Sequence, residues 1–157
     1  MDLDDQKFIR LAIEIAQRAR DNGNHPFGAL LVDQSGQILV EAENSVVTSS
    51  DKTGHAEINL LRKATSKYPA DFLAGCTIYA STEPCAMCCG AIFWSNIRRV
   101  VYGLGEEQLY ELVGWDSEEI LLLPSKEIFS RGRKAIQVIG PVLENEAVAV
   151  HRDFWHS

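Results

Sequence analysis

Two short stretches, TGHAEINLL at residues 53–61 and STEPCAMCCGAI at residues 81–92, carry most of the information in this 157-residue chain. The first places a histidine and a glutamate two positions apart, and the second places two cysteines three positions apart. Each pair stands directly before a run of residues with helical spacing. The two stretches are therefore candidates for the two halves of one metal site.

The cysteine pair has the spacing of metal ligands at the start of a helix. Two thiolates at Cys85 and Cys88 can reach one ion from a first helical turn, and Pro84 suits that turn because its missing N–H would be unpaired there. A helix N-terminus also lowers the pKa of a thiol, which favours the thiolate that a metal needs. Cys89 lies about 100° further around the helix axis, so we expect it in the core.

His55 is the candidate third ligand. Zinc prefers nitrogen and sulfur ligands, and a catalytic zinc keeps three protein ligands and one open position. Residues two apart in a helix interior point away from each other, so His55 and Glu57 can share a site only in the first turn. Glu57 would then carry protons rather than bind the metal.

Each motif also has an ordinary explanation when taken alone. A single His-x-Glu occurs by chance, and a Cys-x-x-Cys in a reducing compartment is either metal-binding or redox-active. Thioredoxin-like redox chemistry would leave the histidine and the glutamate without a role. The crowding of Cys85, Cys88 and Cys89 excludes a four-cysteine structural zinc site. The two motifs together, in this order, favour a catalytic metal site.

Length and composition indicate a single globular domain over residues 1–157. Apolar residues make up 46% of the chain and charged residues 24%, as in ordinary soluble proteins. No apolar run approaches the roughly 20 residues of a membrane span. The acidic start, MDLDDQKFIR, lacks the basic region and apolar core of a secretory signal. The sequence therefore predicts a cytoplasmic protein without a membrane partner.

The net charge of −7 bears on the substrate. Proteins that hold nucleic acid through its phosphates are usually basic or carry a basic stripe. The basic clusters here, Arg98-Arg99 and RGRK at residues 131–134, are equally well explained as solvated surface. Small uncharged substrates fit this balance better than polynucleotides.

The hydrophobic pattern predicts a layered α/β domain. Strand-like runs are expected at residues 27–33, 37–44, 76–81, 98–104 and 134–140. Helical patterns are expected at residues 4–21, 55–67, 85–96, 125–132 and about 143–155. Residues 106–124 are either a helix or an irregular insert. Strands that alternate with helices after an initial hairpin imply helices on both faces of one sheet.

His55-Ala56-Glu57 followed by Pro84-Cys85-Ala86-Met87-Cys88 resembles the zinc-dependent cytidine deaminase-like superfamily, whose known signature is this pairing. The stretches HPFGALLV, TSSDKTGHAEINLLRKA and YASTEPCAMCCGAIFWSNIRRVVYG are most similar to bacterial guanine deaminases and related nucleobase deaminases, with tRNA adenosine deaminases one step further away. The resemblance covers residues 5–105 and extends more loosely to the end. It implies a three-layer α/β/α fold around a five-stranded mixed sheet.

The resemblance also assigns roles to individual residues. It makes His55, Cys85 and Cys88 the ligands of Zn²⁺ and Glu57 the catalytic proton carrier. It further assigns substrate contacts, at Asn44, Phe27, Ala56, Trp94 and Asp116. From the residues alone, Asn44 could equally be a turn residue at a strand end, and Phe27 and Trp94 could be core.

Two departures from the family pattern precede the histidine. Many relatives carry a proline where Lys52 stands and an alanine where Gly54 stands, which bears on the geometry of the loop. The ending HRDFWHS, residues 151–157, is rich in aromatic residues. The expected helix at about 143–155 has an apolar stripe, so we expect it to cover either the active site or a subunit interface in a homodimer.

The expected function is zinc-dependent hydrolytic deamination of an aminated nucleobase by a hydrolase. Guanine, converted to xanthine in purine metabolism, is favoured because Phe27 and Trp94 offer stacking surface and Asp116, Glu118 and Glu119 offer hydrogen-bond acceptors. The alternatives are a cytosine or nucleoside deaminase, a tRNA adenosine deaminase, and a non-catalytic zinc-binding module. The expected partners are a small nucleobase or nucleoside and water, not nucleic acid.

Overall fold

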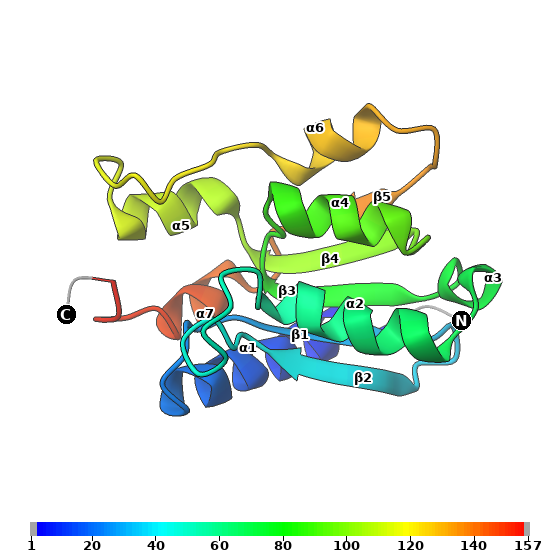
Figure 1. The fold of residues 1–157 in the computed structure, drawn as a ribbon, viewed down its shortest axis with the longest axis horizontal. Helices are drawn as coiled ribbons and strands as arrows, with labels where there is room; N and C mark the ends of the chain where they lie inside the picture. The colour runs from blue at the N-terminus through cyan, green and yellow to red at the C-terminus, as the bar shows by residue number, and fades with distance from the viewer. Residues whose placement is uncertain (1–2, 156–157) are drawn as a thin grey trace.

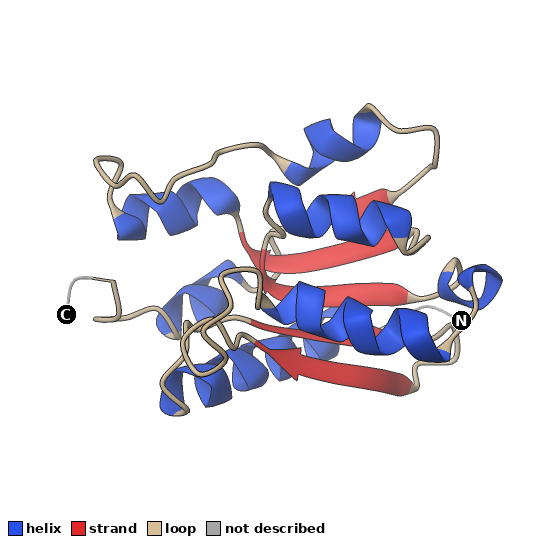
Figure 2. Cartoon of the chain, viewed as in Figure 1, coloured by secondary structure: helices blue, strands red, loops and turns tan. Residues whose placement is uncertain are grey.

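A mixed five-stranded sheet organises residues 3–155, the part of the chain that the computed structural model describes (Figures 1 and 2). The strand order is β2-β1-β3-β4-β5. Strand β1 pairs antiparallel with β2 and with β3, whereas β3, β4 and β5 run parallel. The strands are β1 Gly28–Val32, β2 Ile38–Glu43, β3 Thr77–Thr82, β4 Arg99–Leu104 and β5 Gln137–Ile139. This architecture confirms the predicted fold class.

Helices cover both faces of the sheet, as predicted. Helices α1 (Asp5–Asp21) and α7 (Glu144–Ala149) pack on one face, and α2 (Ala56–Lys67) and α4 (Ala86–Trp94) on the other (Figure 1). Helix α6 (Ser125–Ser130) packs against α4, while α3 (Ala70–Leu73) and α5 (Glu106–Val113) lie beyond the ends of strands. No helix among residues 3–155 combines the length and the apolar character needed to cross a membrane.

The central strands are buried on both faces, which explains their almost continuous apolar sequences. In β1, Ala29 and Leu31 face the core beneath α2 and α4, whereas Leu30 and Val32 face the core beneath α1. Both cores are closed to solvent. The sheet is therefore a fixed platform for the loops at its edges.

One edge of this platform collects the polar motifs. The parallel strands β3 and β4 end at the same edge, and α4 and α5 begin just beyond those ends (Figure 1). Helix α2 also begins at this edge, after the long loop that follows β2 (Figure 1). The carboxyl ends of parallel strands are the usual place for binding sites in open α/β sheets.

The segment after β5 differs from the predicted helix at about 143–155. The helix ends at Ala149, and residues 150–155 form turns. Arg20 donates a hydrogen bond of 2.8 Å to the carbonyl oxygen of Val150, and Asp153 has a φ of 59°, which a right-handed helix does not allow. Tertiary contacts to α1 thus override the helical spacing of the sequence.

Residues 106–124 were expected to form either a helix or an irregular insert, and they form one followed by the other. Helix α5 ends at Val113, the next residue Gly114 has a φ of 101°, and the chain then runs without regular structure to Pro124. The short helix α3 had no counterpart in the predicted elements.

Candidate active site

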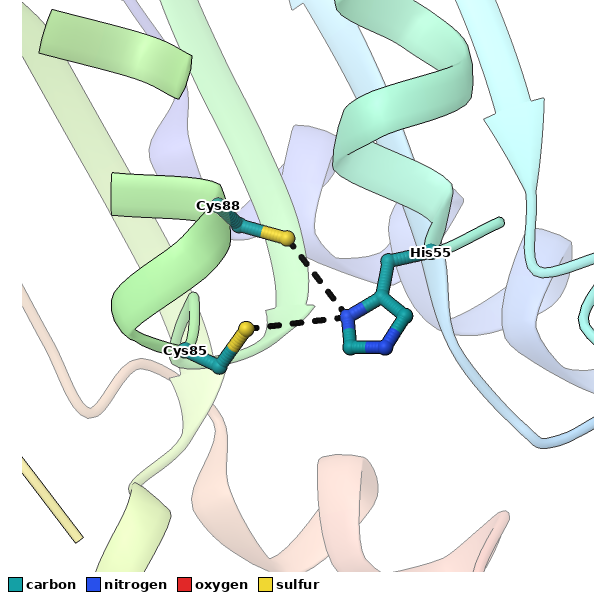
Figure 3. A group of neighbouring side chains, drawn as sticks. All are labelled: His55, Cys85 and Cys88. Carbon is teal, nitrogen blue, oxygen red and sulfur yellow. Dashed lines mark hydrogen bonds between the residues drawn. The ribbon is translucent and has the colours of Figure 1, made fainter. Parts of the chain in front are cut away.

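The histidine and the two cysteines meet at the starts of α2 and α4. His55 is the residue before α2 and Cys85 the residue before α4, both in extended backbone, and Cys88 lies in the first turn of α4. The Sγ atoms of Cys85 and Cys88 are each 3.6 Å from Nδ1 of His55 (Figure 3). The three ligand atoms lie within 4.8 Å of one another.

This donor set fits zinc. One imidazole nitrogen and two thiolate sulfurs are ligands that zinc prefers, and three protein ligands leave the fourth position open, as in catalytic zinc sites. Two sulfurs converge on one ring nitrogen, where an ion bound by all three atoms would lie between them (Figure 3). Among the residues that the structure describes, this is the cluster of histidine, cysteine or acidic side chains able to hold a metal ion.

Hydrogen bonds in the loop before α2 fix the position of His55. The side-chain amide of Asn59 donates to the carbonyl oxygen of Glu43 and to Oγ of Ser45, both at 2.9 Å. The N–H of Ser45 donates to the carbonyl oxygen of Gly54 at 2.9 Å. A Cβ on Gly54 would lie 2.9 Å from Oγ of Ser45. The glycine in place of the family's alanine therefore matches this close approach of Ser45.

The electrostatics of the cluster favour the thiolate form of Cys85, one of the three candidate ligands. The neighbouring Cys88 thiol and His55, acting against burial, lower the pKa of Cys85 to about 4, whereas the pKa of Cys88 is raised, chiefly by its hydrogen bond to Cys85. Burial, with a smaller effect of Cys85, raises the pKa of Glu57 to about 7. A carboxyl group with this pKa is suited to accept and release protons near neutral pH.

A cavity of about 420 Å³ opens beside the cluster and contains the carboxyl group expected to carry protons. Aromatic side chains and acidic side chains share its lining. The lining residues are His25, Phe27, Val46, Lys52, His55, Glu57, Thr82, Glu83, Cys85, Glu106, Leu109, Tyr110, Val113, Glu119 and Trp155. A hollow of similar volume beside α6 and β5 contains none of these residues.

Three of the five predicted substrate contacts lie at or next to this cavity. Phe27 lines it. Ala56 is fully buried between the ligand His55 and Glu57, where it packs in the core beneath α2 and α4. Asn44 is buried, and its Oδ1 accepts the N–H of Val46, a cavity residue, at 3.0 Å. Asn44 thus has the turn role that its position at a strand end indicates.

The other two, Trp94 and Asp116, do not line the cavity. Trp94 is the last residue of α4, so along the helix axis it lies about 9 Å from Cys88 and about 13 Å from Cys85. Its side chain is 79% exposed. Asp116 is exposed in the turn after α5. Neither residue lies at this cavity within one chain, and their contacts with the substrate stay predictions.

Glu83 connects the metal-ligand loop to the segment at residues 106–125, a role that the sequence did not reveal. Its Oε1 accepts the backbone N–H of Glu106 at 2.9 Å, and its Oε2 accepts both the N–H and the hydroxyl of Ser125. Its own N–H donates to the carbonyl oxygen of Leu104 at 2.7 Å. The starts of α5 and α6 are thus both tied to the loop that precedes Cys85.

Trp155 lines the cavity and is held in place by a hydrogen bond to the buried His151. Nε1 of Trp155 donates to Nδ1 of His151 at 3.1 Å, and Nε2 of His151 lies 3.4 Å from Oγ1 of Thr82. Rings of His25 and Phe27 pack against Trp155, with centroids 5.6 and 6.0 Å away. The aromatic ending of the sequence signalled a covering role, and the structure places Trp155 in the cavity wall.

Comparison with known proteins gives a family match and several relatives. The sequence profile of the cytidine and deoxycytidylate deaminase zinc-binding region matches residues 2–104. A probable cytosine deaminase of Schizosaccharomyces pombe is 43% identical over 152 residues, which cover 96% of this chain and 92% of that protein. A tRNA-specific adenosine deaminase of Haemophilus influenzae is 41% identical over 102 residues, 65% of this chain and 59% of that protein.

Solved structures give a consistent result. A guanine deaminase from Nitrosomonas europaea superposes with a TM-score of 0.79 at 25% sequence identity. The superposition covers 97% of this chain and 85% of that one. By their names, these relatives act on different bases: cytosine, adenosine in tRNA, and guanine.

Proposed function

The chain belongs to the cytidine and deoxycytidylate deaminase family and is a zinc-dependent hydrolytic deaminase, and from this premise we propose that it acts on a free aminated nucleobase, cytosine before guanine. The cavity carries this proposal. It is lined by His55, Cys85 and Glu57 together, and by the aromatic rings of Phe27 and Trp155. A flat base between aromatic rings would thus meet the reacting groups directly.

The chain's own residues supply binding and proton transfer in the proposed mechanism. Zinc held by His55, Cys85 and Cys88 would lower the pKa of a water molecule to about 7 and so make it nucleophilic. Glu57 accepts a proton from that water and delivers it to the ring nitrogen next to the amino-bearing carbon. The water oxygen adds to this carbon, Glu57 takes the second proton from the new hydroxyl group and gives it to the amine, and the C–N bond breaks. One water is consumed, ammonia leaves, and a carbonyl group remains on the base.

Cytosine is placed first for two reasons. The similarity to a probable cytosine deaminase extends over almost the full length of both proteins, including the segment after residue 104 that supplies much of the cavity wall. In addition, two of the residues that favoured guanine, Trp94 and Asp116, do not line the cavity. The preference for guanine in the sequence interpretation thus loses part of its basis.

Guanine is the second candidate, on a specific observation. The whole fold superposes on a guanine deaminase, and Glu119, one of the acidic residues expected to bind a purine, lines the cavity with Phe27. A cavity of about 420 Å³ has room for either base.

The remaining candidates are less well supported. A tRNA substrate would bring phosphates to a protein of net charge −7, whose cavity is lined by four carboxyl groups but only one lysine. A non-catalytic zinc module would have no need for a buried glutamate beside a metal site with an open position.

Ammonia release from a substrate panel tests the proposal. The panel contains cytosine, guanine, cytidine, guanosine and a tRNA anticodon stem-loop, each measured as kcat/KM with the zinc-loaded protein. We expect cytosine to exceed every other member at least tenfold. A guanine value tenfold above cytosine would reverse the order of the two bases, and a preference for a nucleoside or the stem-loop would reject the free-base proposal. Protein carrying Glu57→Gln, purified in parallel, is the control for contaminating deaminases.

A further inference from the structure

Glu106 holds a buried oxygen atom that has no partner in the protein. Glu106 is the first residue of α5 and is 3% exposed. Its Oε1 accepts the N–H of Leu123 at 2.7 Å. Its Oε2 is the one buried side-chain nitrogen or oxygen, among the residues described, that lacks a hydrogen-bond partner. Every comparable group in the described part of the chain is satisfied, so this exception requires an explanation.

The protein does not relieve this oxygen by other means. The charged group that acts on Glu106 from its own network is Glu83, a second carboxylate, which disfavours the ionised form. Rotation of the carboxyl group would exchange the two oxygens and leave one of them unpaired again. A buried acceptor without a donor destabilises the protein, and more so when it is charged. Such a cost is expected where a ligand provides the missing donor.

The position of Glu106 indicates where that ligand would lie. Glu106 lines the same cavity as Glu57, His55 and Cys85. Two acidic residues from different elements therefore line one cavity, Glu57 from the first turn of α2 and Glu106 from the first turn of α5. One of them has a proposed role in the reaction, and the other has none.

We propose that Oε2 of Glu106 accepts the ring N–H that is replaced by a sugar in the corresponding nucleoside, and thereby selects free bases. The proposal rests on the proposed function of this site. In cytosine, the amino group and ring nitrogen N3 must face Glu57 and the metal, so N1–H is the remaining N–H donor and lies across the ring. In guanine, the imidazole N–H is likewise remote from the reacting C2 carbon.

This contact has a physical basis for discrimination. A carboxylate accepts hydrogen bonds and, when ionised, cannot donate one. A sugar or methyl group on the ring nitrogen removes the donor and places carbon against a buried carboxylate, which is then desolvated without compensation. Sites built to hydrogen-bond a substrate group reject analogues that lack it far more strongly than apolar pockets reject a change in size. A donor from the base also stabilises the charged carboxylate against the burial that otherwise raises its pKa to about 7.

The test compares cytosine with 1-methylcytosine, and guanine with 9-methylguanine, because each methyl group replaces only the hydrogen in question. Dissociation constants are measured by calorimetry in zinc-loaded Glu57→Gln protein, which should bind without turnover. The same background is combined with Glu106→Gln and, as a matched control, with Glu107→Gln, which alters the exposed next residue of α5. Glutamine keeps an acceptor for Leu123 and puts an N–H₂ group in place of Oε2.

We expect the Glu57→Gln protein, with Glu106 unchanged, to bind the base at least 100-fold more tightly than its methylated form. Glu106→Gln should weaken binding of the base at least tenfold, with little change for the methylated base, so that the ratio falls. Glu107→Gln should leave both values unchanged. A merely structural role of Glu106 would lower thermal stability while the ratio stays the same, and that result overturns the proposal.

Two further outcomes keep the test decisive. If Glu106→Gln does not fold, the affinities of the Glu57→Gln protein for the base and for the methylated base still test the proposal, because equal affinities contradict it. If the protein binds bases with the expected ratio but releases no ammonia from any of them, the proposed function fails while the role of Glu106 in recognition stands.

Discussion

Cys88 is a fully buried candidate ligand in the first turn of α4, so its replacement tests metal binding and folding together. Cys88→Ser should remove most of the zinc and lower the thermal midpoint, because part of the binding free energy of a structured metal site is folding free energy. Elemental analysis and thermal unfolding measure the two effects. Cys89→Ser is the matched control, since Cys89 is equally buried but donates to the carbonyl oxygen of Pro84 and should keep the metal. Full zinc retention by Cys88→Ser would contradict the ligand assignment.

Glu57 should show the opposite pattern. Glu57→Gln keeps the size and shape of the side chain but cannot accept a proton from water. We expect unchanged zinc content and thermal stability, with kcat lower by about 10²–10⁴-fold, the usual contribution of a general acid–base. Steady-state kinetics on the best base of the panel give the answer. Turnover at the parent rate would show that Glu57 is structural and that another group transfers the proton.

Site residues could be predicted from the sequence where a short local motif identifies them. His55, Cys85 and Cys88 could be brought together from spacing and from the family resemblance, because each stands at the start of its helix. Trp94 could not be excluded from the site by composition, since only the direction of α4 places it at the far end. Glu106 carried one usable signal, a carboxylate directly after the buried strand next to β3. Its decisive feature is that the carboxyl group has a single hydrogen-bond partner, the N–H of Leu123. That contact joins residues 17 positions apart and cannot be read from local sequence.

At the scale of elements, the turns after α7 depend on the protonation state of His151. The indole N–H of Trp155 can only donate, so Nδ1 of His151 must be unprotonated to accept it. Burial, with a smaller effect of Arg20, lowers the pKa of His151 to about 4, below the value of about 6.5 in an unfolded chain. The unfolded state therefore binds the proton first as the pH falls. The contribution of His151 to stability is complete above pH 6.5 and is lost between about pH 6.5 and pH 4.

Urea unfolding at pH 7 and at pH 5 tests this dependence. As the pH is lowered from 7 to 5, the free energy of unfolding should decrease more in the parent than in His151→Asn, whose amide oxygen can still accept the N–H of Trp155 but does not titrate. His25 and His55 are common to both proteins, so the difference in slope isolates His151. Equal slopes would show that His151 titrates alike in the folded and unfolded states.

Elements whose ends are set by local sequence were predicted closely, and those set by distant contacts were not. The start of α1 follows from Asp4, whose side chain accepts the N–H of Lys7, and the starts of α2 and α4 follow from the motifs. The end of α7 depends on Arg20 of α1, which donates to the carbonyl oxygen of Val150, and on His151, which contacts Thr82 of β3. Helical spacing alone carries no information about such contacts.

For the whole molecule, the strand runs and their alternation with helices were visible in the sequence. The order β2-β1-β3-β4-β5 was not visible, and the family resemblance implied only a mixed sheet of five strands. The cavity needs residues from positions 25 to 155, brought together by that order. This explains why the metal half of the site was predictable and the substrate half largely was not.

The expected homodimer now has a different candidate surface. The apolar stripe that suggested a partner for the last helix is mostly used within the chain, since Ala147 and Val150 are buried. Helix α4 instead exposes Met87 and Trp94, which lie two turns apart on one helix face. Between them on this face lie Gly90 and Ala91, and a Cβ on Gly90 would meet no atom within 4 Å. Small residues between large apolar ones allow close approach of a second helix.

We therefore predict a homodimer with the α4 stripe in its interface. Light scattering at micromolar concentration should give twice the chain mass of 17.5 kDa. Trp94→Glu should give the mass of a single chain, because it places a charge where a large apolar side chain is now 79% exposed. Phe72→Glu, which changes an exposed aromatic residue on α3, is the matched control and should leave the dimer intact. A single-chain mass for the parent would refute the dimer, and a stable dimer of Trp94→Glu would move its interface away from α4.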